Sequence, residues 1–275
     1  MRAELLSRER ITRTLNGIAF VRRIEYRPTI GSTNDLAKQL GTEGAPEATL
    51  VIADEQTAGR GRLGREWWTP PGAAIAMSLL LRPAFPPALA YRLTMLAGLV
   101  AAEAIDQVTG LRVGLKWPND IVIAKSEIVS RRSEVVRKLG GILTETSISG
   151  DRIEFAVVGL GVNVSLDFGA RPDLPEATSL GMELGRDVDR LPILCTLVER
   201  FAARYAMIEQ DKRLHADWSA RLTTLGRQVA ARRGEETLAG LAESVDESGA
   251  LLIRADDGAL HRVDAADVTL RDASR

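Results

Sequence analysis

The sequence predicts an α+β protein in two parts, with helices and strands over residues 1–224 and a small antiparallel β-barrel over residues 225–275. Three observations support this prediction. The chain has 275 residues, which is near the size at which a single hydrophobic core stops growing. Segments with helical spacing of apolar residues alternate with short apolar runs that are typical of buried strands. After Thr224 the sequence changes to short, closely spaced runs that favour strands, with turn residues between them.

Helical spacing of apolar residues occurs in four segments of the larger part: residues 4–18, 35–40, 86–110 and 192–208. Ser32 and Asn34 are N-cap types that suit the start of the second segment, and Gly41 is a natural stop for it. In the third segment, apolar residues recur at spacings of three and four, as in an amphipathic helix. Pro192 opens the fourth segment.

Short apolar and β-branched runs predict six strands in the larger part: residues 49–53, 73–81, 112–115, 121–123, 141–146 and 153–164. Residues 22–27 are rich in arginine, and we expect them to lead through Pro28 to a turn at Gly31. In the smaller part, four strand-like runs are separated by turn signals. These runs are residues 229–231, 238–245, 251–254 and 260–263.

Composition narrows the classes of function. The chain carries 36 lysines and arginines against 37 aspartates and glutamates, a formal charge of −1, so any anion site must be local. The single cysteine, Cys195, cannot form an intrachain disulfide, which suits a reducing compartment, and the cytoplasm is the expected location. The apolar runs are shorter than the ~20 residues of a membrane helix, and the N-terminus lacks an apolar signal core.

The most informative segment is residues 59–65, Gly-Arg-Gly-Arg-Leu-Gly-Arg, which we call the arginine–glycine loop. Its glycines let the backbone approach a ligand closely while Arg60, Arg62 and Arg65 converge on it, which suits an anion. From composition alone, a nucleic-acid-binding tract or a solvated flexible loop are the alternatives. However, this tract occurs once, between two predicted strands, and the pair Trp67–Trp68 follows it.

Three further segments carry residues that could bind a ligand or take part in catalysis. Lys116 and Asp120 flank a Trp-Pro corner at the end of a strand, which brings a cation near a carboxylate. The two residues belong either to a reaction site or to a structural salt bridge. Lys138 precedes two glycines and a strand, where a lone lysine usually lies on the surface. In residues 158–164, two glycines let a strand pass close to a flat group, and Asn163 offers an amide that suits the edge of a base. Taken alone, this glycine pair is a weak signal.

Together these motifs, with one more at the predicted helix start, resemble the biotin protein ligases. In order they are Gly-Ser-Thr-Asn-Asp from Gly31, the arginine–glycine loop, Lys-Trp-Pro-Asn-Asp from Lys116, Lys-Leu-Gly-Gly-Ile-Leu from Lys138 and Gly-x-Gly-x-Asn from Gly159. The resemblance implies a mixed β-sheet backed by helices, followed by an SH3-like C-terminal barrel. It also implies an ATP-dependent ligase that activates biotin as biotinoyl-5′-AMP and transfers it to a lysine of a biotin carboxyl carrier protein or domain.

The resemblance implies a role for each matching residue. Biotin would contact Ser32, Thr33, Asn34, Gln56, Gly59, Arg60, Trp67, Gly141, Leu143 and Gly159. The nucleotide would contact Arg60, Arg62, Arg65, Lys138, Gly161 and Asn163. Both reaction steps build negative charge on phosphoryl or carbonyl oxygens, so fixed cations matter more than a nucleophile from the enzyme. The catalytic residues would be Arg62, Arg65, Lys138, Lys116 and Asp120. Mg²⁺ would accompany ATP; no metal ligand is assigned, and Asp120 is named only as a neighbour of the ion.

Two features depart from the family pattern. The stretch between Asp120 and Lys138 is longer than usual, and its residues 125–136 are polar and charged, which predicts a lengthened surface hairpin. Only 31 residues precede Ser32, too few for the DNA-binding domain of some members, so we expect no DNA partner. The shortness of the apolar runs predicts no membrane partner. A homodimer is compatible with the family. We expect the arginine–glycine loop and residues 165–179 to be mobile without ligand and to exclude water once they order over the adenylate.

Two other functions are open from the sequence. A lipoate ligase or octanoyl transferase has a related fold, but the arginine–glycine loop favours biotin. Pyrophosphate exchange with biotin or with lipoate decides between them. A nucleic-acid-binding module would use the arginine–glycine loop and the barrel, but near-neutral charge and an aromatic content of 4% disfavour it. Salt-dependent RNA binding without adenylate formation would favour the module.

Overall fold

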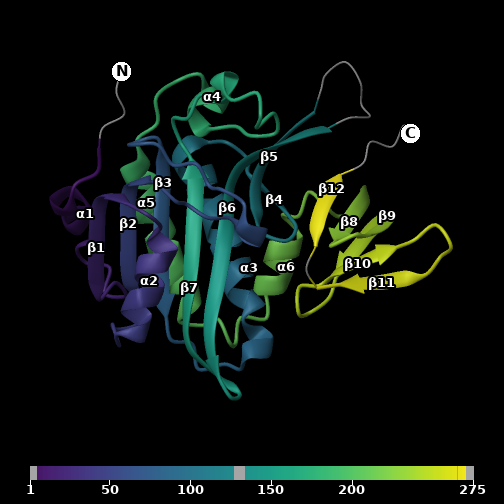
Figure 1. Ribbon diagram of the computed structural model, residues 1–275, viewed down its shortest axis with the longest axis horizontal. Helices are drawn as coiled ribbons and strands as arrows, with labels where there is room; N and C mark the ends of the chain where they lie inside the picture. The colour runs from purple at the N-terminus through teal and green to yellow at the C-terminus, as the bar shows by residue number, and fades with distance from the viewer. Residues whose placement is uncertain (1–4, 127–133, 265, 271–275) are drawn as a thin grey trace.

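The larger part of the protein is built on a seven-stranded β-sheet with helices on both faces (Figure 1). The computed structural model describes residues 5–126, 134–264 and 266–270. The strand order is β1-β2-β3-β7-β6-β5-β4. Strands β1 and β2 pair in parallel, and the other neighbouring strands pair antiparallel. The prediction of a mixed sheet backed by helices is confirmed.

The strands of this sheet are β1 (Arg23–Ile30), β2 (Thr49–Gln56), β3 (Ala74–Leu81), β4 (Gly114–Lys116), β5 (Asp120–Ser126), β6 (Glu134–Ser149) and β7 (Arg152–Asn163). All eight residues of β3 are buried, because the strand lies inside the sheet with packed helices on either side. Strand β6 is much longer than the predicted run and pairs along its length with β5 and β7.

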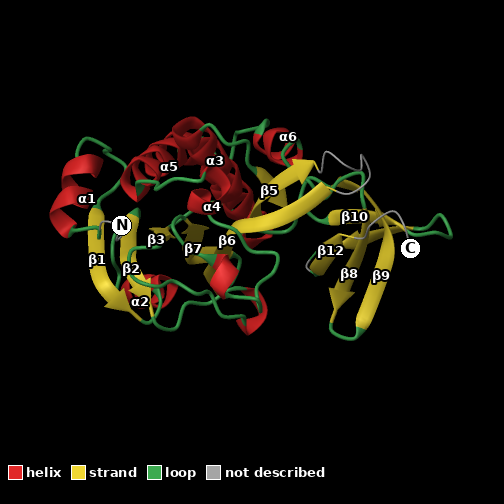
Figure 2. Ribbon diagram, turned by 90° about the horizontal axis from the view of Figure 1, so that it is seen from above, coloured by secondary structure: helices red, strands yellow, loops and turns green. Residues whose placement is uncertain are grey.

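The helices are α1 (Arg8–Leu15), α2 (Thr33–Thr42), α3 (Tyr91–Thr109), α4 (Leu180–Leu184), α5 (Arg190–Tyr205) and α6 (Leu214–Ser219). Three short 3₁₀ turns are η1 (Arg62–Gly64), η2 (Pro87–Leu89) and η3 (Phe168–Ala170). Figure 2 shows α3 and α5 on one face of the sheet and α2 on the other. Separate clusters of buried apolar side chains lie on the two faces, and the cluster on the α3 and α5 face is the larger.

Helix α3 is the core helix of the larger part. With the preceding turn η2, residues 87–109 would be long and apolar enough to span a membrane by length and composition alone. However, 67% of the most apolar stretch of this segment is buried inside the fold, where α3 packs against α5, α6 and the sheet. Gly110 ends the helix in the left-handed conformation, as its position predicts.

Several predicted boundaries are wrong, each for a physical reason. Residues 23–30 form a strand that the sequence pattern does not predict; it lies at the sheet edge, where Pro28 removes no needed ladder bond. Gly41 does not end α2, which continues to Thr42; the glycine instead lets Phe155 pack closely against the helix. Helix α5 begins before Pro192, because Asp189 caps its N-terminus.

The smaller part is a five-stranded antiparallel sheet, ordered β11-β10-β9-β8-β12. Its strands are β8 (Gln228–Arg233), β9 (Glu236–Val245), β10 (Leu251–Arg254), β11 (Leu260–Val263) and β12 (Asp267–Leu270). Among the described residues, no pairing joins the outer strands β11 and β12. The sheet packs beside the corner between β4 and β5 (Figure 1). There Trp117 donates from its ring Nε1 to the Gly249 carbonyl, 2.8 Å away, and from its backbone nitrogen to the Thr224 hydroxyl, 2.9 Å away.

The expected insertion is an extension of the β5–β6 hairpin. Its arms pair from the Asp120–Gly141 end to the Ser126–Glu134 end of the ladder. Residues 127–133 of the predicted segment lie outside the described residues. Lys138 stays in the ladder opposite Val122, so the longer hairpin leaves it beside the site described next.

Candidate active site

A cavity of about 740 Å³ opens beside the sheet, between the arginine–glycine loop, the β4–β5 corner and β12. Of the residues predicted for the site, all except Gly59 line it: Ser32, Thr33, Asn34, Gln56, Arg60, Arg62, Arg65, Trp67, Lys116, Asp120, Lys138, Gly141, Leu143, Gly159, Gly161 and Asn163. The five sequence motifs therefore meet in one place, although they are spread over more than 130 residues of the chain.

One end of the cavity is built from neutral hydrogen-bonding groups. Ser32 caps α2, so Thr33 and Asn34 occupy its first turn, beneath the end of β2. The Gln56 side-chain oxygen accepts from the Thr33 backbone nitrogen at 2.9 Å and from the Thr33 hydroxyl at 3.1 Å. Its amide nitrogen donates to the Thr69 hydroxyl at 3.2 Å. These bonds fix which side of the Gln56 amide faces inward.

Asn34 is held by a network that reaches the surface. Its amide nitrogen donates to the Leu143 carbonyl at 3.1 Å and to the Glu145 carboxylate at 2.8 Å. Burial acts to raise the pKa of Glu145, but hydrogen bonds from Lys38 and Asn34 and the nearby positive charges outweigh burial, so the pKa lies below its ordinary value. Asn34 is therefore anchored by a carboxylate that stays ionised.

The arginine–glycine loop is shaped by close backbone contacts. A Cβ on Gly59 would lie 2.3 Å from the Trp67 carbonyl oxygen, so only glycine fits where the Trp67 backbone nitrogen donates to the Gly59 carbonyl at 2.8 Å. Gly59 therefore supports the cavity from behind instead of lining it. Leu63, at the tip, adopts a left-handed φ of 57° and is 74% exposed.

Trp67 forms one wall of the cavity and lies directly against β7. A Cβ on Gly161 would lie 2.5 Å from two atoms of the Trp67 indole, so the glycine makes room for the ring. The indole nitrogen is buried and has no hydrogen-bond partner among the described residues, so the ring is held without a hydrogen bond from its nitrogen. The Lys138 ammonium lies 5.7 Å from the ring centroid, within the range of a cation–π contact.

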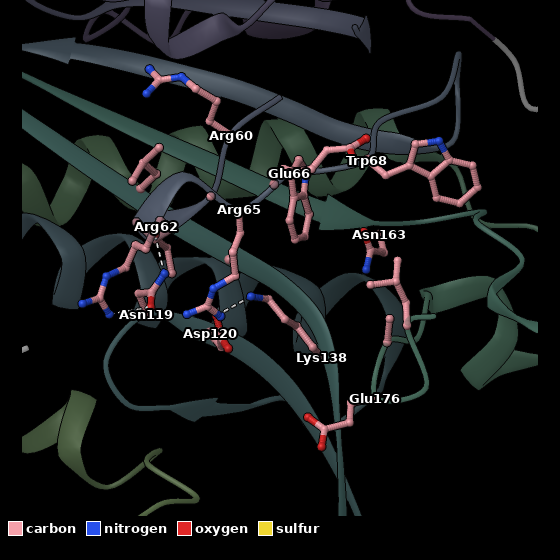
Figure 3. Close-up of a pocket in the computed structure, with 18 of the residues that line it drawn as sticks. Arg60, Arg62, Arg65, Glu66, Trp68, Asn119, Asp120, Lys138, Asn163 and Glu176 are labelled. Carbon is pink, nitrogen blue, oxygen red and sulfur yellow. Dashed lines mark hydrogen bonds and ion pairs between the residues drawn. The ribbon is translucent and has the colours of Figure 1, made fainter. Parts of the chain in front are cut away.

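The other end of the cavity is cationic, and several of its cations already have partners. Lys138 binds the Asp120 carboxylate at 2.7 Å, so Asp120 pairs with Lys138 and not with Lys116 across the Trp-Pro corner. Arg60 turns away from the other arginines (Figure 3) to pair with Asp35 and Glu145. The Arg60 guanidinium therefore does not converge with Arg62 and Arg65 as expected, and its contact with a ligand stays a prediction.

Two cations of this end are left without a carboxylate partner. Arg62 donates to the side-chain oxygen of Asn119 at 3.1 Å (Figure 3), and within the described ranges neither Arg62 nor Lys116 forms an ion pair. Arg65 pairs with Asp267, which belongs to β12 of the smaller sheet. An anion entering the cavity therefore meets two uncompensated positive charges and a third whose carboxylate partner it can displace.

Residues 165–179 border the cavity, and backbone hydrogen bonds join this segment to β6 at Lys138. The Lys138 backbone nitrogen donates to the Glu176 carbonyl at 2.6 Å, and the Lys138 carbonyl accepts from the Thr178 nitrogen at 2.9 Å. The Asn163 amide nitrogen donates to the Thr178 carbonyl at 3.0 Å, which leaves its oxygen and one hydrogen for a ligand.

Sequence reasoning missed several residues of the site. Asp267, Val268 and Thr269 reach the cavity from the smaller sheet, and no local motif marks them. The Arg171 guanidinium lies 4.7 Å from the centroid of the Trp68 ring at the cavity edge, and the paired tryptophans are the only sequence signal for this contact. Ser78 contacts Thr33 and Asn34 from behind the cavity lining. Its polar side chain within an apolar strand is a sequence signal that could have pointed to it.

No group of three or more histidine, cysteine, aspartate or glutamate side chains that could hold a metal ion occurs in the part of the chain that the structure describes. Magnesium usually takes one or two protein carboxylates and completes its shell with phosphate oxygens and water. The donor set here therefore fits a cation that arrives on a phosphate ligand and does not fit a cation held by the protein alone.

Comparison with known families gives two matches in this chain. Residues 26–163 match the biotin/lipoate A/B protein ligase family, and residues 224–271 match the biotin protein ligase C-terminal domain. The first match spans the strands and loops that build the cavity, and the second spans the smaller sheet.

Individual relatives agree with these matches. The biotin–[acetyl-CoA-carboxylase] ligase of Paracoccus denitrificans is 35% identical over 234 residues, covering 82% of this chain and 92% of the relative. The bifunctional ligase/repressor BirA of Bacillus spizizenii is 34% identical over 249 residues, covering 89% and 73%. Among solved structures, a biotin protein ligase from Aquifex aeolicus in complex with biotin and ATP superposes with a TM-score of 0.72 and 27% identity, covering 92% of this chain and all of the other.

Proposed function

The chain belongs to the biotin/lipoate A/B protein ligase family, and from this premise we propose that it is an ATP-dependent biotin protein ligase. A biotin carboxylate oxygen attacks the α-phosphorus of ATP, and the bond to the leaving pyrophosphate breaks, which gives biotinoyl-5′-AMP. A lysine amine of a carrier protein or domain then attacks the acyl carbon, and AMP leaves. The observation that carries this proposal is a single cavity with a neutral hydrogen-bonding end and a cationic end, which matches the two halves of that adenylate.

The neutral end is proposed to bind the ureido ring of biotin. Gln56 and Thr33 line this end of the cavity, where their polar groups can bond to a polar ring that binds there. Each such hydrogen bond is worth about 1 kcal/mol net and costs about 1–3 kcal/mol if a buried partner is left unpaired. The Trp67 indole is the flat apolar surface against which the valeryl chain would lie.

The cationic end is proposed to bind the phosphates and to stabilise the charge that develops on them. Arg62 and Lys116 lack carboxylate partners among the described residues and are free to bind phosphate oxygens. Lys138 is held by Asp120 at 2.7 Å, which keeps its ammonium at the junction of the two ends. There it would stabilise charge on the reacting oxygens, an effect that fixed cations provide without reorganisation. Arg65 would exchange Asp267 for phosphate.

Magnesium is proposed to enter with ATP, where it would offset the charge of the leaving pyrophosphate. Asp120 lines the cavity beside Lys138, and because it is bonded to Lys138 we propose it as a neighbour of the ion and not as its ligand. Asn163 is proposed to contact adenine through the amide atoms that Thr178 leaves free.

The remaining sequence expectations are kept as proposals. The division into a catalytic domain (1–224) and a C-terminal domain (225–275) is supported by the separate sheets, and the acceptor is proposed to be a carboxylase carrier domain because of the name of the Paracoccus relative. A cytoplasmic location, a homodimer and the lack of a DNA partner are predictions that fractionation, sedimentation and operator footprinting test.

The decisive experiment for the function is incubation of the protein with biotin, Mg-ATP and a carrier domain, read by intact mass of the carrier. The proposal predicts a single biotinoyl addition that requires ATP and the acceptor lysine. Lipoate replaces biotin in a parallel reaction. Modification by lipoate with none by biotin would contradict the proposal, because the family includes lipoate ligases.

A further inference from the structure

Ser78 is a polar residue in the middle of an apolar strand. It belongs to β3, whose other residues are alanine, isoleucine, leucine and methionine, and its exposed fraction is 0%. Burying a hydroxyl away from water is unfavourable unless it forms hydrogen bonds. Its side chain faces the first turn of α2 and does not line the cavity. The sequence motifs do not include it, and the mechanism above does not use it.

The Ser78 hydroxyl touches two residues of the neutral end at once. Its oxygen lies 2.6 Å from the Asn34 side-chain oxygen and 2.8 Å from the Thr33 hydroxyl oxygen. A serine has one hydroxyl proton. The Asn34 oxygen can only accept, and both hydrogens of the Asn34 amide are engaged by Leu143 and Glu145. The Ser78 proton is therefore shared between the Asn34 oxygen and the Thr33 oxygen, of which the Asn34 oxygen is the nearer.

The Thr33 hydroxyl contacts both Gln56 and Ser78. It donates to the Gln56 side-chain oxygen at 3.1 Å, and that oxygen also accepts from the Thr33 backbone nitrogen at 2.9 Å. The Ser78 hydroxyl contacts the Thr33 oxygen at 2.8 Å. Because its proton is directed to Gln56, Thr33 offers only a lone pair to the cavity.

Gln56 provides the complementary group. Its oxygen is fully used by Thr33, one amide hydrogen goes to Thr69, and the second amide hydrogen is left for a ligand. The neutral end therefore presents one acceptor beside one donor. A cyclic urea carries an N–H beside a C=O and satisfies both. A dithiolane or an alkyl end satisfies neither and would leave two buried groups unpaired.

We propose that Ser78 is a positioning residue that supports the specificity of the cavity for a ureido head group, by holding the side chains of Thr33 and Asn34 in place. This inference rests on the proposed function, because it assigns the cause of the preference for biotin. Without the Ser78 hydroxyl, the Asn34 oxygen loses its donor, and Thr33 keeps its bond to Gln56 but loses its contact with Ser78. Affinity for the head group then falls while the phosphate end is unchanged.

The test is Ser78→Ala, assayed by biotin-dependent pyrophosphate exchange into ATP. The expected result is a rise of about tenfold in the KM for biotin, the size of one neutral hydrogen bond, with kcat and the KM for ATP little changed. Desthiobiotin, which keeps the ureido ring and lacks the sulfur, should show the same rise. A merely structural role would lower the amount of active enzyme and leave both KM values unchanged.

Two further variants make the result decisive. Ser78→Cys keeps the size of the side chain with a weak donor and should raise the KM for biotin by a smaller factor, which covers the case in which Ser78→Ala does not fold. Thr94→Val is the matched control, because it removes another buried hydroxyl pair, with Thr144 at 2.8 Å, outside the cavity lining. It should leave the KM for biotin unchanged. Wild-type KM values in both Ser78 variants would overturn the inference, whereas a wild-type protein without biotin-dependent exchange would overturn the proposed function itself.

Discussion

Gly161→Ala is predicted to move one wall of the cavity without unfolding the protein. A Cβ at this position would lie 2.5 Å from two indole atoms of Trp67 and 2.7 Å from a third. Carbon atoms in contact normally stand about 3.5–4.0 Å apart, so the ring must retreat by about 1 Å. It must retreat into the cavity, because Gly161 lies behind it in β7.

The magnitude follows from what holds the ring. The Trp67 indole nitrogen has no hydrogen-bond partner among the residues described, so displacement of the ring breaks no hydrogen bond, and the free energy of unfolding should change by less than about 1 kcal/mol. A misplacement of about 1 Å next to reacting groups can lower the rate by about 10²-fold. We therefore expect kcat/KM for biotin-dependent pyrophosphate exchange to fall by about that factor.

A double-mutant cycle tests this steric explanation. In a Trp67→Leu background, the shorter side chain leaves room for the Cβ, so Gly161→Ala should have little further effect on kcat/KM. Urea denaturation of both single variants checks that the loss is not a loss of fold. If Gly161→Ala lowers activity by the same factor in both backgrounds, the contact with Trp67 is not the cause and the reasoning is refuted.

Three other predictions concern charged groups. Arg190→Met leaves Asp54 buried without its 2.6 Å partner, both side chains being 3% exposed, and should lower the free energy of unfolding by about 3–5 kcal/mol in urea. Lys138→Met should lower kcat for adenylate formation by about 10²–10³-fold, with the KM for biotin little changed, because the ammonium is proposed to act on charge that develops during the reaction. Glu145 has a folded-state pKa below its ordinary value, so its stabilising contribution is present above the ordinary pKa and is lost as the pH falls through the folded value. The wild-type protein should therefore be more stable than Glu145→Gln at neutral pH, and the difference should shrink on acidification.

Each of these has a result that would contradict it. Equal urea midpoints for Arg190→Met and the wild type would show that the buried pair with Asp54 adds no stability. A Lys138→Met variant with a raised KM for biotin and an unchanged kcat would assign Lys138 to ground-state binding. A stability difference for Glu145→Gln that grows on acidification would mean that the pKa shift has the opposite sign.

The fold could be predicted from the sequence where periodicity and burial agree. Helix α3 and strand β3 follow their apolar patterns closely, because both lie in the core, where burial decides the sequence. Strand β1 has a charged and proline-containing sequence because an edge strand needs fewer ladder bonds, so its pattern does not distinguish it from a loop. The length of β6 depends on its partner strands, which no local pattern describes.

The site could be predicted as a set of residues but not as a set of contacts. All but one of the predicted site residues line the cavity, since each motif combines a glycine or a strand end with a polar side chain. The partners of the arginines were not predictable, because Arg60 pairs with Glu145 from β6 and Arg65 with Asp267 from another sheet. Such pairs depend on tertiary packing across more than 80 residues of sequence.

The central claim is that the cavity holds biotin with its ureido ring at Gln56 and its carboxylate near Lys138. The most direct test is a crystal structure of the protein with biotin and a non-hydrolysable ATP analogue. The account predicts that the ureido ring contacts Thr33 and Gln56, with the α-phosphate beside Arg62 and Lys138. Biotin bound outside this cavity, or bound in it with its carboxylate at Gln56, would contradict the account.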